Sequence, residues 1–60
     1  MNEFRITYYW VRNNEFKILI FDKYIEAVEC LIKMLQVNER TRLYYGIKYD
    51  FEFDNIKYRR

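Results

Sequence analysis

Few side chains in this sequence could carry out covalent or metal chemistry. The single thiol is Cys30, and the chain contains no His that could act as its base. A lone Cys excludes a disulfide within one chain, and without His or a second thiolate a structural zinc site is excluded as well. We therefore interpret Cys30 as a non-catalytic residue on the polar flank of a helix.

Three carboxylates, Asp50, Glu52 and Asp54, alternate along one predicted strand and could together bind a divalent cation. The strand pairing described below places Glu52 opposite Lys57 and Asp50 opposite Arg59, so cross-strand charge pairing is the better interpretation. A single Gly also leaves no Gly-rich loop for phosphate. The sequence thus predicts a protein that is not an enzyme and has no metal, cofactor or small-molecule substrate.

Length and composition restrict the class of protein further. The 60 residues are expected to form one domain, 1–60, and a domain of this size buries only about 60% of its unfolded surface, which disfavours an enclosed active site. The longest apolar run, 18–21, is far shorter than the roughly 20 residues of a membrane span. The N-terminus lacks the pattern of a signal peptide. We expect a cytoplasmic protein with no membrane partner.

Alternating hydrophobicity predicts a first strand at 4–11 and a second that starts at Phe16. The intervening Asn13 and Asn14 favour a tight hairpin turn, because Asn tolerates a positive φ. The hairpin is expected, but its register has two alternatives.

The two registers of this hairpin differ in which side chains share a face. A two-residue loop pairs Tyr8 with Leu19, whereas a three-residue loop pairs Trp10 with Ile18, and a one-residue slip reverses the faces. We prefer the three-residue loop because it separates apolar from mixed side chains more cleanly. It gathers on one face Phe4, Ile6, Tyr8, Trp10, Phe16, Ile18 and Ile20.

The period then changes to that of a helix, expected from about Lys23 to Val37. Asp22 stands where an N-cap residue belongs, and Asn38 is the expected left-handed stop. The apolar face of the predicted helix consists of Tyr24, Ile25, Val28, Leu31, Ile32 and Leu35.

A long strand is predicted at 42–53, with a bend at Gly46. Asp54 and Asn55 form a two-residue turn signal, which pairs Phe53 with Ile56 in a second hairpin. The inward face of the long strand is expected to hold Leu43, Tyr45, Ile47, Tyr49, Phe51 and Phe53.

The expected element order is ββαββ, a two-layer α+β fold with one helix packed on one face of the sheet. A right-handed crossover places the third strand beside the first. The result is an antiparallel sheet with the strand order 2-1-3-4.

One helix cannot cover this sheet, because a helix is about 10–12 Å across and four strands spaced about 4.8 Å apart are wider. The uncovered apolar residues gather at the last hairpin, and an apolar patch of this kind normally marks an interaction surface. A simpler alternative is that the Tyr rings pack sideways at the rim of the sheet, with their hydroxyls in water. The predicted partner-binding residues are Trp10, Tyr49, Phe51, Phe53, Ile56 and Tyr58.

The leading functional prediction is a non-catalytic protein-binding module that also self-associates as a homodimer. The residue types with AT-rich codons (Phe, Tyr, Met, Ile, Asn and Lys) make up 31 of the 60 residues. In this composition the chain is similar to short open reading frames of phages and mobile elements of low-GC bacteria. That similarity implies an inhibitor of the anti-defence type, which would occupy a host protein surface in the host cytoplasm.

The alternative is a small nucleic-acid-binding protein that uses a basic and aromatic sheet face. The net charge of +2 gives this alternative little support, and Asp50 and Glu52 continue the same predicted face. Binding that weakens steeply with salt would distinguish it from the leading prediction. Its candidate residues are Arg42, Tyr44, Lys48, Lys57 and Arg59.

Overall fold

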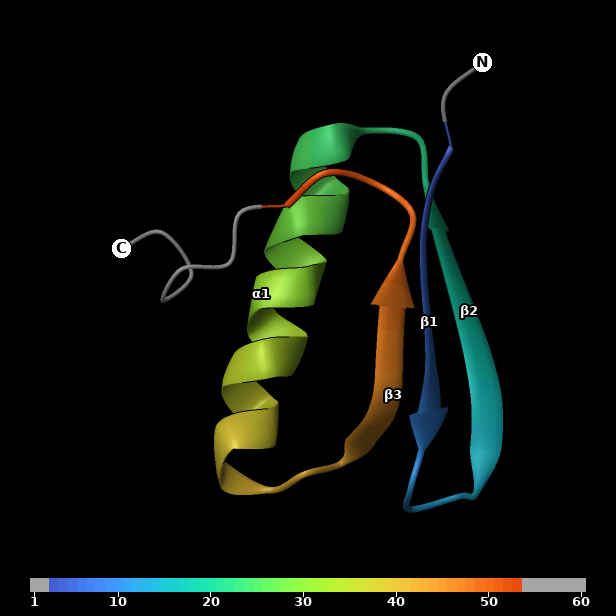
Figure 1. The fold of residues 1–60 in the computed structure, drawn as a ribbon, viewed down its shortest axis with the longest axis vertical. Coiled ribbons are helices and arrows are strands. Elements are labelled where there is room, and N and C mark those ends of the chain that lie inside the picture. Colours follow the sequence, from blue (N-terminus) through green and yellow to red (C-terminus); the bar gives the residue numbers. More distant parts are fainter. Residues whose placement is uncertain (1–2, 54–60) are drawn as a thin grey trace.

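The computed structural model describes residues 3–53 and arranges them as a sheet and one helix. Strand β1 spans Phe4–Trp10, strand β2 spans Glu15–Phe21, helix α1 spans Tyr24–Arg40 and strand β3 spans Tyr44–Tyr49. The helix forms one layer beside the sheet (Figure 1). The predicted α+β class, with one helix packed on an antiparallel sheet, is therefore confirmed.

The three strands have the order β2-β1-β3, and both neighbouring pairs are antiparallel. The predicted position of the third strand beside the first is thus confirmed, and α1 makes the crossover between β2 and β3. The predicted turn at 54–55 and the fourth strand that follows it lie outside the described residues.

The first hairpin closes with a four-residue turn, because Trp10 pairs with Glu15. Asn14 in this turn has a φ of 56°, the left-handed conformation that Asn tolerates. Both predicted loop lengths are therefore wrong, and the preferred three-residue loop also assigned the wrong faces to β2. The residues that it turned inward are more than half exposed: Phe16 (56%), Ile18 (54%) and Ile20 (59%).

The alternation within β2 predicted the wrong faces, because its uniformly apolar side is the exposed one and its covered side also carries Glu15 and Lys17. Leu19 and Phe21 are half-buried on the helix side, while Ile18 and Ile20 project from the other side. The length of the turn decides between the two arrangements, since a change of one residue exchanges the faces. The two-residue alternative gives the observed faces, although the observed partner of Leu19 is Ile6.

Helix α1 begins one residue later and ends three residues later than predicted. The N-cap position is Lys23, which is extended and makes no side-chain capping bond, so the prediction of Asp22 as the N-cap is wrong. No helix among the described residues has the length and apolar character needed to cross a membrane.

The helix packs on the sheet along Ala27, Leu31 and Met34, all of which are buried. The predicted apolar face was centred to one side of this stripe, so that Tyr24 and Ile25 were expected inside but are exposed. The small Ala27 is fully buried, which shows that the helix rests on the sheet through a side chain that permits close approach. The buried stripe therefore depends on side-chain size as well as on hydrophobicity.

Asn38 lies within α1, and its side chain connects the helix to β3. Its Nδ2 donates to the backbone oxygen of Tyr44 at 2.7 Å, and its Oδ1 accepts from the backbone N–H of Tyr44 at 2.9 Å. The left-handed residue after the helix is Arg42, with a φ of 58°. The prediction of Asn38 as the helix stop is therefore wrong, because its amide group takes the place of a strand partner at the start of β3.

The core lies between α1 and the covered face of the sheet. Ile6 and Leu31 are fully buried, and Tyr8 and Met34 join them. Cys30, predicted on the polar flank, is half-buried against this cluster, with its Sγ 3.9 Å from Met34 Sδ.

A second packed group closes one end of the molecule. We call it the aromatic cluster, and its members are Phe4, Tyr24, Tyr49, Phe51 and Phe53. Its ring centroids are 5.4 Å apart for Tyr49 and Phe51 and 5.9 Å apart for Tyr49 and Phe53. The hydroxyl of Tyr24 donates to the backbone oxygen of Glu52 at 2.7 Å. These contacts hold 51–53 against the helix, although this segment is not part of β3.

Candidate functional site

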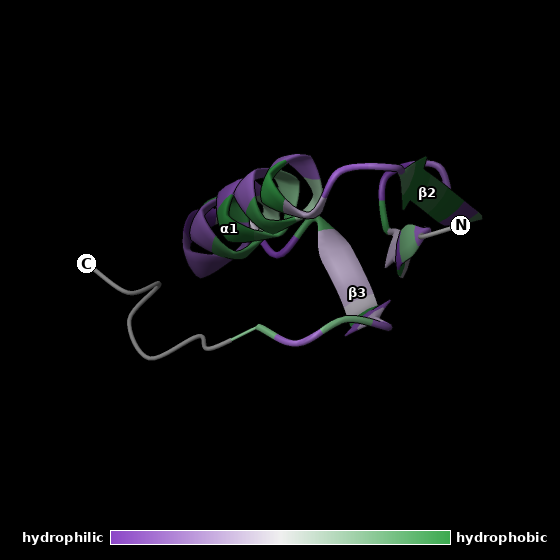
Figure 2. Cartoon of the chain, turned by 90° about the horizontal axis from the view of Figure 1, so that it is seen from above, coloured by the Kyte–Doolittle hydropathy of each residue, from purple (hydrophilic) through white to green (hydrophobic). Residues whose placement is uncertain are grey.

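The sheet face opposite α1 carries the largest group of exposed apolar side chains in the described structure. We call it the open face, and its residues are Arg5, Thr7, Tyr9, Phe16, Ile18, Ile20, Tyr45 and Lys48. Figure 2 shows the strong apolar character of β2 beside the more hydrophilic β3. The open face therefore changes from apolar to polar across the three strands.

The first row across the open face is aromatic. Tyr9 of β1 pairs with Phe16 of β2 on one side and with Tyr45 of β3 on the other. The ring centroids of Tyr9 and Phe16 are 5.8 Å apart, and the two rings are tilted by 56°. Tyr45 is 63% exposed. Three neighbouring aromatic rings on three strands thus form one row that faces solvent.

The second row contains Ile18, Thr7 and Lys48, because Thr7 pairs with both of the others. Ile18 is aliphatic and Lys48 is charged, so this row carries the change in polarity from β2 to β3. The ion pairs within residues 3–53 join Arg5 to Glu3 and Lys17 to Glu15, and neither includes Lys48. Lys48 is therefore the basic group that the open face can offer to a ligand.

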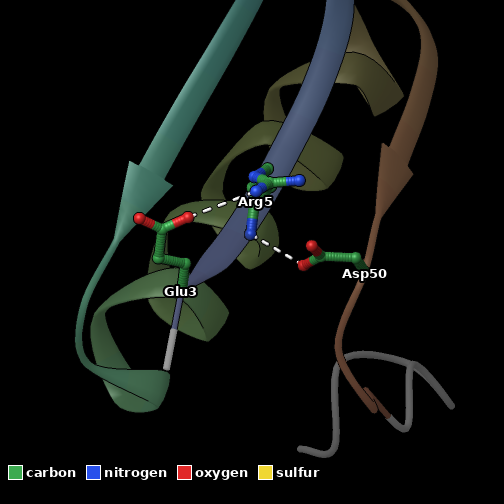
Figure 3. Close-up of polar contacts among 3 residues, drawn as sticks. All are labelled: Glu3, Arg5 and Asp50. Carbon is green, nitrogen blue, oxygen red and sulfur yellow. Dashed lines mark hydrogen bonds and ion pairs between the residues drawn. The ribbon is translucent and has the colours of Figure 1, made fainter. Parts of the chain in front are cut away.

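The third row consists of Ile20 on β2 and Arg5 on β1. The polar groups at the β1 end of this row already have partners (Figure 3). Arg5, which pairs with Ile20, places its Nη2 3.2 Å from Oε1 of Glu3. The backbone N–H of Arg5 donates to Oδ1 of Asp50 at 2.8 Å, and the N–H of Asp50 donates to the backbone oxygen of Arg5 at 3.2 Å. Asp50 thus extends the pairing of β1 beyond the end of β3, and one oxygen of its carboxylate already accepts a hydrogen bond from β1.

A bulge in β3 decides which tyrosine reaches the open face. Thr7 pairs with Lys48 and Tyr9 pairs with Tyr45, so two residues of β3, Gly46 and Ile47, lie opposite the single Tyr8. Gly46 has a φ of 56°, which a residue without Cβ adopts at no steric cost. The bend predicted at Gly46 is present as this bulge. Because the bulge adds one residue, the residues before Gly46 lie on the opposite face from the one that they would occupy in an uninterrupted strand.

The bulge exchanges the predicted positions of two tyrosines. Tyr44, predicted on the solvent face, packs edge-on against Tyr8 with ring centroids 5.1 Å apart. Tyr45, predicted inside, projects into solvent instead. Both face predictions are wrong for the same reason, because strict alternation over 42–53 assumed a strand without an extra residue. The strand itself is also shorter than predicted, since β3 ends at Tyr49.

The open face contains a hollow of about 480 Å³ between the first two rows. Thr7 and Gly46 are the small residues of its lining, and their size leaves space between the larger side chains. The surrounding residues are Tyr9, Phe16, Tyr45 and Lys48. This geometry can receive one large apolar side chain, with a basic group at the rim.

The predicted partner-binding residues within the described structure are mostly engaged with one another. Tyr49, Phe51 and Phe53 belong to the aromatic cluster, and Trp10 is half-buried beside the core. The ammonium of Lys17 lies 5.6 Å from the centroid of the Trp10 ring. The described part of the last hairpin is thus packed together, with Tyr49 still 37% exposed, and partner binding through this hairpin stays a prediction. Ile56 and Tyr58 lie outside the described residues.

The predicted nucleic-acid residues are not brought together on one surface. Lys48 is on the open face, whereas Tyr44 is directed to the core and Arg42 lies in the turn before β3. Lys57 and Arg59 lie outside the described residues.

The groups considered for chemistry do not form a reactive site. Burial raises the pKa of the Cys30 thiol, with a smaller opposing effect of the Lys33 charge. A raised pKa decreases the fraction of reactive thiolate. Among residues 3–53, no three acidic, thiol or imidazole side chains are grouped so that they could hold a metal ion.

Comparison of the chain with protein-family models, with curated proteins and with solved structures found no match.

Sequence reasoning missed most of the open face. Tyr9, Phe16, Ile18, Ile20 and Tyr45 were absent from the predicted sites. One signal was present, because β2 carries apolar residues on both faces and a helix can cover only one of them. A second signal was the lone Gly46 within an alternating strand, which often marks a bulge.

Proposed function

We propose that this protein is a non-catalytic protein-binding module that uses its open face to occupy the surface of a partner protein. The observation that supports this proposal best is the exposure of Phe16, Ile18 and Ile20, each more than half accessible on a face that no described element covers. Contiguous apolar surface of this kind normally marks an interaction site. The stability of the fold does not require it, since the opposite face of the same strands contacts the helix.

The shape and charge of the face define the partner. The hollow over Thr7 and Gly46 fits one large apolar side chain, and buried apolar anchors dominate the energy of most interfaces. Lys48 at the rim would pair with a carboxylate of the partner, which fixes orientation more than it adds affinity. The partner is thus a protein surface that presents an apolar anchor beside an acidic residue.

Binding by occupation agrees with the lack of a reactive site in residues 3–53. An inhibitor that blocks a host protein, as the composition of the chain implies, needs surface complementarity and no catalytic group. In such an inhibitor the exposed side chains of Ile18 and Ile20 would contact the host protein.

A second candidate function is the binding of single-stranded nucleic acid, which the aromatic row favours. Phe16, Tyr9 and Tyr45 lie side by side on adjacent strands, and bases stack on aromatic side chains in this way. Lys48 lies beside them. The aliphatic half of the face gives no such contact and favours the protein partner.

Photo-crosslinking tests the proposal directly. A photoreactive amino acid replaces Ile18 in one variant and Glu29, which is exposed on the helix, in a control variant. After crosslinking in the native cell, the protein captured from position 18 and not from position 29 is purified. Its binding to the wild-type chain is then measured by calorimetry at two salt concentrations.

We expect Ile18→Thr to weaken this binding roughly tenfold or more, because burial of a large aliphatic side chain contributes about 1.5–3 kcal/mol. Glu29→Gln should have no effect. Equal capture at both positions, or an affinity unchanged by Ile18→Thr, would contradict the proposal. Capture of nucleic acid alone, with an affinity that falls steeply with salt, would replace it with the second candidate.

A further inference from the structure

The outer edge of β2 is an unpaired strand edge among the described residues, because β2 ends the strand order β2-β1-β3. The direction of its backbone groups follows from β1. Arg5 exchanges hydrogen bonds with Asp50, and Val11 donates to the backbone oxygen of Leu43, so both direct their backbone groups toward the β3 side. Because backbone groups alternate along a strand, Ile6 and Tyr8 direct theirs toward β2.

The same alternation continues into β2. Ile6 pairs with Leu19 and Tyr8 pairs with Lys17, so Leu19 and Lys17 direct their N–H and C=O groups toward β1. The backbone groups of the residues between and beside them therefore point to the outer edge. These edge residues are Phe16, Ile18 and Ile20, the same three whose side chains are exposed on the open face.

We propose that a second copy of the chain pairs with this edge, β2 against β2, antiparallel and about a two-fold axis at Ile18. In this register Ile18 faces Ile18 of the second copy, and Phe16 faces Ile20 of the second copy. All three outward-directed residues then form hydrogen-bonded pairs. Their apolar side chains also become cross-strand neighbours on one face, which stabilises paired strands.

The self-complementarity is specific to this register. A shift of the axis to Leu19 pairs Phe16 with Asp22 of the second copy, and a shift to Lys17 places the two lysines opposite each other. Only the axis at Ile18 pairs the three apolar residues entirely with one another, which is the isologous contact that a two-fold dimer requires. The result is one continuous six-stranded sheet.

The edge of β3 is less suited to this contact. It contains the bulge at Gly46 and Ile47, and bulges are a common protection of sheet edges against pairing. The register of β2 with β1 is regular over its whole length. Two edges of one sheet thus differ in regularity and in polarity, and β2 is the edge on which a second strand fits.

Lys17 does not prevent the pairing, although a charge on the covered face of an edge strand can do so. Its Nζ lies 3.3 Å from Oε1 of Glu15 and 5.6 Å from the centroid of the Trp10 ring. The ammonium therefore turns back over its own chain. In the proposed register Lys17 faces Leu19 of the second copy.

The inference concerns the edge of β2 and does not depend on the proposed use of the open face. A wild-type chain that stays monomeric would overturn the edge pairing and leave the partner-binding proposal standing. A dimer whose open face captures no protein other than a second copy of the chain would have the opposite meaning.

Cysteine crosslinking and solution mass test the register together. Wild-type protein is analysed by light-scattering chromatography across a dilution series, where we expect a dimer that dissociates on dilution. Ile18→Cys and Ile20→Cys are then oxidised under the same conditions. Both sites are exposed, and the half-buried Cys30 is common to both variants.

We expect disulfide-linked dimer from Ile18→Cys only. Paired Cα atoms at the axis would be about 5.5 Å apart, within the range of a disulfide, whereas two copies of position 20 would be offset by about 13 Å. Crosslinking should be roughly tenfold faster or more for Ile18→Cys, because pairing raises the effective concentration of the two thiols. Equal rates for the two variants would overturn the register.

Charge substitutions give an independent test of the same pairing. Phe16→Lys combined with Ile20→Glu places opposite charges across the axis, and Phe16→Lys combined with Ile20→Lys places like charges there. We expect the first variant to remain dimeric and the second to become monomeric at all concentrations measured. The same mass for both variants would contradict the pairing.

Discussion

The two faces of the sheet are built from similar side chains but have different environments. On the covered face, Ile6 is fully buried beside Leu31 of the helix. On the open face, Ile18 is 54% exposed. Burial of apolar surface is the main favourable contribution to folding, so the covered face determines stability. The open face contributes less to it, because its apolar side chains stay largely accessible to solvent.

The same substitution, Ile to Thr, can be made on each face of the sheet, and it gives the largest expected difference in the free energy of unfolding. Ile6→Thr removes buried apolar surface and adds a hydroxyl without a partner, which should lower the free energy of unfolding by about 2–4 kcal/mol. Ile18→Thr should change it by no more than about 0.5 kcal/mol, because the site is exposed and Thr is also β-branched. Urea unfolding at low protein concentration measures both. Equal losses would show that the two faces do not differ in this way.

The amide of Asn38 fixes the start of β3 and therefore holds Tyr44 on the covered face. Asn38→Ala leaves the N–H and C=O of Tyr44 without these partners. We expect a loss of about 1–3 kcal/mol in urea unfolding. Gln36→Ala, at an exposed position of the same helix, is the control and should be nearly neutral. An Asn38→Ala variant with unchanged stability would show that β3 starts at Tyr44 without the two hydrogen bonds from Asn38.

The bulge at Gly46 places Tyr44 on the covered face and Tyr45 on the open face. Gly46→Ala meets no neighbouring atom within 4 Å, so its cost comes only from the left-handed backbone and should be about 1–2 kcal/mol. Gly46→Asn should cost less, since Asn adopts this conformation more readily. Thermal unfolding of the three proteins provides the comparison. Equal stability of the Ala and Asn variants would contradict a strain-based effect.

The covered layer also contains two groups that respond to pH. Burial raises the pKa of the Cys30 thiol above its ordinary 9.0, and burial together with the neighbouring Tyr44 raises that of Tyr8. Because the folded state favours the neutral forms, the unfolded chain loses these protons first as the pH rises. The free energy of unfolding should thus decrease above about pH 9. Urea unfolding of the wild type and of Cys30→Ala, whose decrease should be smaller, measures this effect.

For the described residues, the sequence was sufficient for the elements and their order but not for the faces. The alternation at 4–11 and the helical period after Asp22 each have one apolar side, so the positions of β1 and α1 follow directly. In β2 both sides carry apolar residues and the side that also carries charges is the covered one, and the turn length that selects the faces has no signature in Asn13 and Asn14 alone. The left-handed Asn14 confirms the turn but not its size.

The β3 residues of the candidate site were missed for a different physical reason. A bulge adds one residue to a strand and leaves the local alternation unchanged, so the pattern on either side of Gly46 reads as one continuous strand. Only the pairing with β1 shows that Tyr45 and Lys48 share the open face. The coverage argument correctly predicted that apolar surface would exceed what one helix covers. It did not identify the exposed apolar residues of β2, and the surface that it predicted at the last hairpin includes residues outside the described part of the chain.

The position of Trp10 has a practical consequence for spectroscopy. It is the single Trp of the chain, it is half-buried beside the core, and it lies under the ammonium of Lys17. Its fluorescence emission therefore reports on closure of the first hairpin and on the covered side of the sheet. A ligand bound to the opposite side would leave this emission almost unchanged, so a silent fluorescence titration would carry no information about binding there.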